Sequence, residues 1–370
     1  MTREIDERDL VALGAPGPGM VAARVAPAPR PWGQWLVSAL FLGFLVYVAT
    51  RFGGGSGVRL DLARAQWGWI PVAVGLHAVS FALYGGLYQH GFRAVGVRAG
   101  ARRLVAVLFA SIFVKTVVPL TGASAMAVFI DDAASHGQSG ARAAAGTVVV
   151  SGIDLLASLP FVGAGVFALA ARHRLAPYDV VGAAFFVAFI GLLVAALALA
   201  GLRPGLLEAG LRVARALVNR VGALVRRPDL VPQGWVRRSA GQFAEAAQAV
   251  PRHPREVSIA FAFSLVLHVA NALGLYALFL AFGHRPDPGV VVAGLGASIV
   301  FFVVSVVPDG IGAVEGAMTL VFVSLGIDPA TAILVTLAYR ILNVWIPVAL
   351  GFVVARQLRL FGGRGVAVAG

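Results

Sequence analysis

The sequence predicts an all-α polytopic membrane protein with about six transmembrane helices and two re-entrant helical hairpins in an inverted-repeat arrangement. Three observations predict this class. Hydrophobic residues make up 59% of the 370 positions and charged residues 13%, roughly half the share of a soluble domain. Several apolar runs reach about 20 residues, the length that crosses a ~30 Å hydrocarbon core. Two further apolar regions are short and are interrupted by proline and glycine.

The long apolar runs are interpreted as transmembrane helices. They cover residues 32–49, 69–88, 146–170, 179–201, 257–282 and 330–355. The segment before them mixes arginine with acidic residues and is then rich in proline and alanine, which is typical of a disordered tail. It does not resemble a cleavable signal peptide, because no short apolar core follows its charged region, so the first run is expected to stay as a signal anchor.

The two interrupted regions are interpreted as re-entrant hairpins. The first, 104–118, breaks at "PLTG" and resumes as "ASAMAVFI"; the second, 290–307, breaks at "PDGIG" and resumes as "AVEGAMTLVFVSLG". Arms this short favour hairpins that enter and leave by the same face. The breaks contain Pro119 and Gly122 in one case and Pro308 in the other, and both read Val-Pro, then Gly-Ala, then Ala-Met. Paired breaks in opposite orientation indicate a transporter with its site near the midplane.

Arginine placement predicts the topology. The loop at 93–103 and the segment 202–256, with ten arginines, are richer in positive charge than the loops at 51–64, 172–174 and 285. By the positive-inside rule, both termini are cytoplasmic in a multi-pass protein of the inner (plasma) membrane. The formal net charge of +13 therefore indicates loop placement and no nucleic-acid binding.

The chain divides accordingly. We expect a disordered cytoplasmic tail at 1–31, a first membrane half at 32–201 with its hairpin near 104–131, a cytoplasmic amphipathic basic segment at 202–256, a second membrane half at 257–356 with its hairpin near 290–327, and a cytoplasmic tail at 357–370. In the basic segment, apolar residues recur every three or four positions from Leu207 and again from Val236. This pattern predicts two amphipathic helices, which either lie on an anionic membrane surface or pack on the transmembrane bundle.

Ionisable residues within the apolar regions are the first candidates for function. A charge at a helix centre costs roughly 2.5–3.5 kcal/mol on insertion scales, so it needs a partner or a hydrated cavity. The candidates are Lys115, the only lysine of the chain, with Asp154, Asp309, Glu315 and Arg340.

Neutral polar residues accompany these charges at helical spacing. The stripes are Thr147, Ser151, Asp154 and Ser158; Thr336, Arg340, Asn343 and Pro347; Ser264, His268 and Asn271; and His77, Ser80 and Tyr84. Four helices with one polar face each can enclose a hydrated cavity. Alternatively, the hydroxyl and amide groups join neighbouring helices by hydrogen bonds.

The break "PDGIGAVEG" indicates anion binding. Gly310 and Gly312 permit an unwound backbone, and the half-helix after it begins with free N–H groups and a positive dipole end. Such an end favours a lipid phosphate. Glu315, one turn in, is expected to satisfy these donors or to pair with Arg340 or Lys115.

No cofactor, metal or catalytic group is expected. The chain has no cysteine. Its histidines lack metal-site spacing, and the lysine lies outside any nucleotide-binding GxxxxGK[ST] motif.

The last 70 or so residues carry a resemblance to a known family. "VPDGIGAVEGAM" and "GIDPATAILVTLAYRILNVWIPVALG" resemble the flippase-like family typified by the transmembrane region of lysylphosphatidylglycerol synthase. The matching positions are Pro308, Gly310, Gly312, Glu315, Tyr339, Arg340, Trp345, Pro347 and Gly351. The family usually has a glycine where this chain has Asp309, and an acidic and a basic residue in the first break, where this chain has "GASAMAV". Lys115 is interpreted as a displaced positive charge.

The resemblance implies a lipid flippase or scramblase that moves a phospholipid or lipid-linked headgroup between leaflets. Lys115, Arg340 and the hairpin N–H groups would hold the phosphate, with Glu315 and Asp154 as counter-charges. Better-known relatives carry a soluble aminoacyl-transferase domain, whereas 15 residues follow Ala355 here, so we expect no enzyme activity. The alternatives are a secondary transporter of a small polar solute and a non-transporting partner of a lipid-modifying enzyme. Membrane lipids with anionic headgroups are the expected partners, with a homo-oligomer or such an enzyme as further candidates.

Overall fold

The computed structural model describes residues 65–117, 123–224, 234–305 and 307–357. Within these ranges the secondary structure is helical and contains no strand. Five helices are long and apolar enough to cross a membrane, of which the last is built from α14, a π-helical segment η2 and α15. They are α4 (Trp69–Ala94), α7 (Gly140–Ala171), α8 (Pro177–Leu202), α11 (Pro254–Ala281) and Pro329–Gln357, made of α14 (Pro329–Arg340), η2 (Ile341–Trp345) and α15 (Ile346–Gln357).

Helices long and apolar enough to span therefore cover five of the six predicted runs, and each begins and ends within six residues of its run. The remaining span, 32–49, and the tail at 1–31 lie outside the described residues. Proline explains several helix starts, because α8, α11, α12 and α14 carry it in the first turn, where its missing N–H is no loss.

Two pairs of shorter helices occupy the predicted hairpin positions. α5 (Ala101–Val117) packs on α6 (Ala123–Ser135), and α12 (Pro288–Val304) packs on α13 (Ala313–Ser324). A single 3₁₀ turn, η1 (Pro308–Gly310), lies in the second break. The first break, with Pro119 and Gly122, is outside the described residues.

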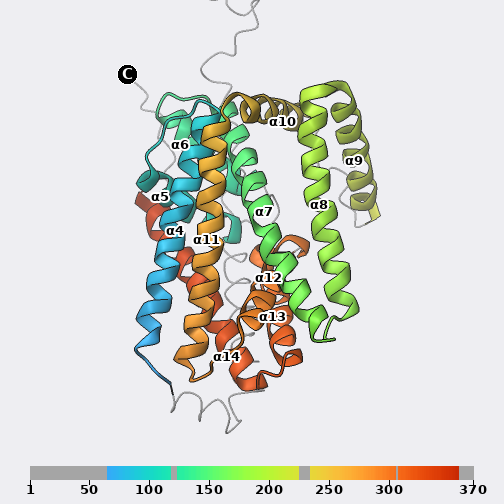
Figure 1. Cartoon of the computed structure of the whole chain (residues 1–370). Helices are drawn as coiled ribbons and strands as arrows, with labels where there is room; N and C mark the ends of the chain where they lie inside the picture. Colours follow the sequence, from blue (N-terminus) through green and yellow to red (C-terminus); the bar gives the residue numbers. More distant parts are fainter. Residues whose placement is uncertain (1–64, 118–122, 225–233, 306, 358–370) are drawn as a thin grey trace, which may run out of the picture. The chain divides into compact units, whose positions relative to one another are not determined.

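Small residues allow the helices to approach closely. α4 and α11 run side by side (Figure 1), and a Cβ at Gly274 would lie 2.5 Å from the ring of His77. α15 packs on α5, where a side chain at Gly351 would collide with the carbonyl of Phe109. Glycine at these positions is required because the facing helix fills the space of a side chain.

The apolar side chains divide between interior and outer surface as expected in lipid. Large residues such as Phe92, Phe279 and Phe322 are buried between helices. By contrast, α8 exposes much of its apolar surface, with Val181 68% and Leu192 69% exposed. Since water would disfavour such a surface, this helix faces hydrocarbon.

The basic segment forms the two expected helices, α9 (Pro204–Leu224) and α10 (Trp235–Arg252). α10 packs on α7 and α8 and buries Ala246 and Ala249, which favours packing on the bundle over lying free on a membrane surface. α9 buries Leu207 but leaves Val213 and Leu217 about 60% exposed. α10 therefore matches the alternative of packing on the bundle, and α9 keeps the exposed apolar residues expected of a helix on a membrane surface.

Candidate functional site

The break between α12 and α13 unwinds the backbone as the sequence predicted. Helix α12 ends at Val304 and α13 begins at Ala313. Asp309, Gly310 and Gly312 have φ of 53°, 65° and 86°. Glycine adopts this left-handed region freely, whereas a residue with a side chain is strained there by about 1–3 kcal/mol. Asp309 therefore holds a conformation that its neighbours must stabilise.

Lys115 reaches this break from the last turn of α5. Its Nζ lies 2.5 Å from Oδ1 of Asp309, and Thr116 donates a hydrogen bond of 2.5 Å to the other carboxylate oxygen. The ammonium also lies 5.0 Å from the ring centroid of Phe302, within cation–π range. Asp309 is 7% exposed, while the Lys115 side chain is 31% exposed. The ion pair thus joins the end of the first hairpin's leading helix to the break of the second.

Arg340 holds the same break from its other side. Its Nε donates to Oε1 of Glu315 at 2.7 Å, and its Nη2 donates to the backbone carbonyl of Asp309 at 2.6 Å. The second oxygen of Glu315 accepts from the N–H of Gly312 at 2.7 Å. Arg340 and Glu315 are each 4% exposed. A pair this buried is stable only when further hydrogen bonds satisfy it, and the unwound backbone supplies them.

We call Lys115, Asp309, Glu315 and Arg340 the break cluster. Its two cations and two carboxylates balance. Glu315 both satisfies a free N–H and pairs with Arg340, as expected, while Lys115 pairs with Asp309. Of the other predicted residues, Gly310 and Gly312 form the turn, and Pro308 begins η1. Asn343 lies in the π-helical segment that directly follows Arg340.

Asp154 lies in a different cluster, on α7, and its contacts are with α4 and α11. Its Oδ1 accepts a hydrogen bond of 2.6 Å from Ser264 and lies 3.3 Å from Nε2 of His268. Tyr84 donates to its Oδ2 at 3.5 Å. We call Asp154, Tyr84, Ser264 and His268 the Asp154 cluster. Three of the four predicted polar stripes meet here, whereas the expectation that Asp154 serves as a counter-charge to Lys115 or Arg340 is not matched by its contacts.

Several stripe hydroxyls donate hydrogen bonds within their own helix. Thr147, Ser158 and Ser80 donate to carbonyls of their own helices, three or four residues earlier. This common helix bond satisfies the hydroxyl in an apolar environment without a partner.

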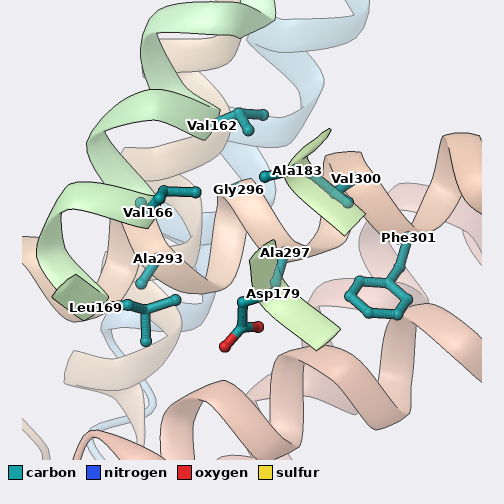
Figure 2. Close-up of a pocket in the computed structure, with 11 residues that line it drawn as sticks. Val162, Val166, Leu169, Asp179, Ala183, Ala293, Gly296, Ala297, Val300 and Phe301 are labelled. Carbon is teal, nitrogen blue, oxygen red and sulfur yellow. The ribbon is translucent and has the colours of Figure 1, made fainter. Parts of the chain in front are cut away.

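Sequence reasoning missed two side chains. Thr116 donates to the buried Asp309, and only its place beside Lys115 signals this. Asp179 lies at one end of an apolar crevice between α7, α8 and α12 (Figure 2), and accepts a hydrogen bond from Ala176 N at 3.0 Å. Asp179 lies in the first turn of α8, and its carboxylate accepts from the N–H at the start of that helix. This capping bond explains the residue. In the part of the chain that is described, no three His, Asp or Glu side chains are arranged to hold a metal ion.

These features define a polytopic helical membrane protein whose buried ion pairs are built around a helix break. The family model of the lysylphosphatidylglycerol synthase TM region matches residues 34–351, and the chain belongs to this family. A UPF0104 membrane protein of Methanothermobacter thermautotrophicus is 21% identical over 296 residues, 78% of this chain and 85% of the relative. One of Pyrococcus horikoshii is 31% identical over 118 residues, 32% of this chain; the match spans about a third (35%) of that relative.

The two departures from the family pattern are complementary in the structure. Asp309 and Lys115 are the positions at which the resemblance predicts these departures. These two residues form one ion pair of 2.5 Å. The carboxylate of Asp309 is therefore neutralised by the ammonium of Lys115. The interpretation of Lys115 as a displaced charge is consistent with this contact.

Proposed function

We propose that the protein is a lipid flippase or scramblase that moves a phospholipid or lipid-linked headgroup between leaflets through a hydrated cavity near the midplane. The observation that carries the proposal is the break cluster. Two cations and an unwound backbone meet between the hairpins, and the protein's own carboxylates hold the cations. Membership of the family supports it.

The proposal includes the arrangement in the membrane. α5 has 17 residues, α6 has 13 and α13 has 12, or about 26, 20 and 18 Å at 1.5 Å per residue. These lengths are below the ~30 Å of the hydrocarbon core, so we assign both helix pairs as re-entrant hairpins in an inverted repeat. With the span at 32–49, six transmembrane helices place both termini in the cytoplasm and the chain in the inner membrane.

In the proposed mechanism, a headgroup phosphate replaces the carboxylates of the break cluster one at a time. Lys115 is the accessible member, so the phosphate first exchanges with Asp309 at its ammonium. Arg340, which lies deeper, then binds the phosphate as its fork of N–H groups leaves Glu315. The acyl chains stay in the bilayer during the exchange. Each cation keeps an anionic partner during the exchange, whereas the bound phosphate leaves the site with one surplus negative charge.

The remaining assignments belong to the same proposal. We assign no catalytic chemistry to the chain and no nucleic-acid partner. Its partners are membrane lipids with anionic headgroups; a homo-oligomer or a lipid-modifying enzyme are further candidates. Lipid translocation between the leaflets is driven by a gradient or is passive.

Proteoliposomes with fluorescent lipids test the proposal. The wild type is expected to expose inner-leaflet lipid to dithionite, and Lys115→Ala or Glu315→Gln is expected to abolish this. Lys115→Arg, which keeps the charge, should retain part of the rate, and Arg174→Ala, in an exposed loop, should retain all of it. Thermal unfolding of each variant separates lost function from lost folding.

The wild type moving no more lipid than empty liposomes, over a range of headgroups, would overturn the proposal. Counterflow of a water-soluble substrate without lipid movement would replace it with a solute transporter. Co-purification of a lipid-modifying enzyme, with activity that survives the loss of Lys115 and Glu315, would replace it with a non-transporting partner.

A further inference from the structure

The Asp154 cluster has no part in holding the phosphate in this mechanism, yet it places a carboxylate and an imidazole together inside the membrane span. We propose that Asp154 and His268 form a proton-binding site, and that the bound proton moves together with an anionic headgroup. The coupling to headgroup movement rests on the proposed function, whereas the proton-binding site can be tested without it.

The geometry suits a shared proton. Nε2 of His268 lies 3.3 Å from Oδ1 of Asp154 and makes no hydrogen bond within the described residues, while Ser264 donates to the same oxygen at 2.6 Å. A carboxylate and an imidazole at this distance can share one proton. His268 is 6% exposed, while the Asp154 side chain is 28% exposed, so the carboxylate is the entry point. Acid and histidine chains of this kind mark proton pathways in membrane proteins.

Further buried polar atoms lie on helices that also carry members of the two clusters. His77 Nε2, Asn271 Oδ1 and Thr336 Oγ1 have no hydrogen-bond partner within the described ranges, although their residues are 2%, 7% and 1% exposed. They lie on α4, α11 and α14, and α11 packs on both other helices. Groups this buried are normally satisfied by internal water, which makes about three hydrogen bonds per molecule.

The ring contacts lead from these atoms toward Arg340. His77 lies 5.6 Å from the ring of Tyr339, in an edge-to-face arrangement, and Tyr339 directly precedes Arg340 on α14. Nδ2 of Asn343 is a further buried atom without a hydrogen-bond partner in the described residues, just beyond Arg340. A file of water along these atoms would join the Asp154–His268 pair to the break cluster.

The titratable groups that face Asp154 leave His268 as its natural proton partner. α4 presents Tyr84 and Tyr88, α11 presents His268, and α14 presents Tyr339 beyond Tyr84. α12, which also packs on α7, carries no titratable residue. Tyr84 donates its own phenol hydrogen to Asp154, so it does not compete for the shared proton.

Charge balance gives the pair a function. The break cluster is neutral when empty, so a phosphate adds one negative charge to a region of low dielectric constant. One proton taken up by Asp154 or His268 cancels that charge. On release at the other leaflet, the phosphate leaves and the proton dissociates. The cycle moves one proton with one monoanionic headgroup and carries no net charge across the membrane.

Infrared difference spectroscopy of the purified wild type, titrated over pH, tests the proton site directly. We expect a protonated-carboxyl band or an imidazolium band that titrates and that changes in both Asp154→Asn and His268→Gln. Asp179→Asn, at a buried carboxylate in the first turn of α8, is the control and should leave these bands unchanged. Ser264→Ala should shift the titration without removing it. Identical titrations in the wild type and both variants would overturn the proton site.

The coupling of the proton to lipid movement is tested with the same variants in proteoliposomes with an imposed pH gradient. One linked proton changes the headgroup equilibrium by up to about tenfold per pH unit, so wild-type translocation should respond to the gradient. Asp154→Asn should lose that response. Translocation that is insensitive to the gradient, beside a titrating Asp154, would overturn the coupling alone. Absence of any lipid movement would overturn the proposed function, while the spectroscopic result for the proton site would stand.

Discussion

The two buried clusters solve the problem of polarity in a membrane in different ways. The break cluster holds four ionised groups, and its most buried bonds use backbone atoms of the break, the carbonyl of Asp309 and the N–H of Gly312. The Asp154 cluster lies on continuous helices, whose backbone groups already bond one another, so it has only side chains as partners. A broken helix can therefore stabilise several buried charges, whereas the intact helices here support one carboxylate.

Removal of Arg340 should have the largest effect on stability. Arg340→Ala leaves Glu315 as a buried, unpaired carboxylate, so unfolding free energy should fall by about 3–5 kcal/mol. The measurement is denaturant or thermal unfolding in detergent. Arg356→Ala, at an exposed position of α15, is the matched control and should change stability by at most about 0.5 kcal/mol. Equal effects of the two substitutions would contradict the central place of Arg340 in the break cluster.

A smaller effect is expected in the Asp154 cluster. Ser264→Ala removes a hydrogen bond to a carboxylate and should lower the free energy of unfolding by about 2 kcal/mol. Ser80→Ala is the control, because its equally buried hydroxyl donates only to a carbonyl of its own helix and its loss should matter less. A larger loss in Ser80→Ala would show that the bond to Asp154 is not the stronger one.

The Lys115–Asp309 pair should show a modest coupling, because the lysine side chain is partly exposed. In a double-mutant cycle of Lys115→Ala and Asp309→Gly, the interaction energy should be about 1 kcal/mol. Asp309→Gly also removes the strain of a positive φ and restores the residue usual in the family. Additive losses would show that the two departures from the family pattern are independent.

The smallest effect should come from a surface ion pair. The hydrogen bond from Gly289 N, followed by the contact with Arg172, lowers the pKa of Asp287 below 3.8. Its contribution is therefore present above about pH 4 and is lost as pH falls through the folded-state pKa. Thermal unfolding of Asp287→Asn should differ slightly from the wild type at pH 7 and converge with it at low pH. A stability difference between the two proteins that grows on acidification would contradict the lowered pKa of Asp287.

Much of the fold was predictable because its signals are local. Apolar runs gave five described spans, and proline with glycine gave the break after Val304. The candidate list also held all four residues of the break cluster. The partners of a polar residue were harder to predict. The contacts of Asp154 with Ser264 and Tyr84 could not be predicted, because its polar stripe has the same spacing whichever helices face it. Thr116 was missed since a threonine beside a lysine carries no distinct pattern.

By itself, the sequence determined that the chain lies in a membrane, where its helices run, and that one of them breaks among charges. Hydrophobicity, proline and glycine act over a few residues, so they can be read along the chain. Only the tertiary structure decided which cation meets which carboxylate. Thr116 and Asp309 are 193 residues apart, and their contact depends on how α5 packs beside the break. An ion pair stabilises a structure only when packing brings its two halves within a few ångströms.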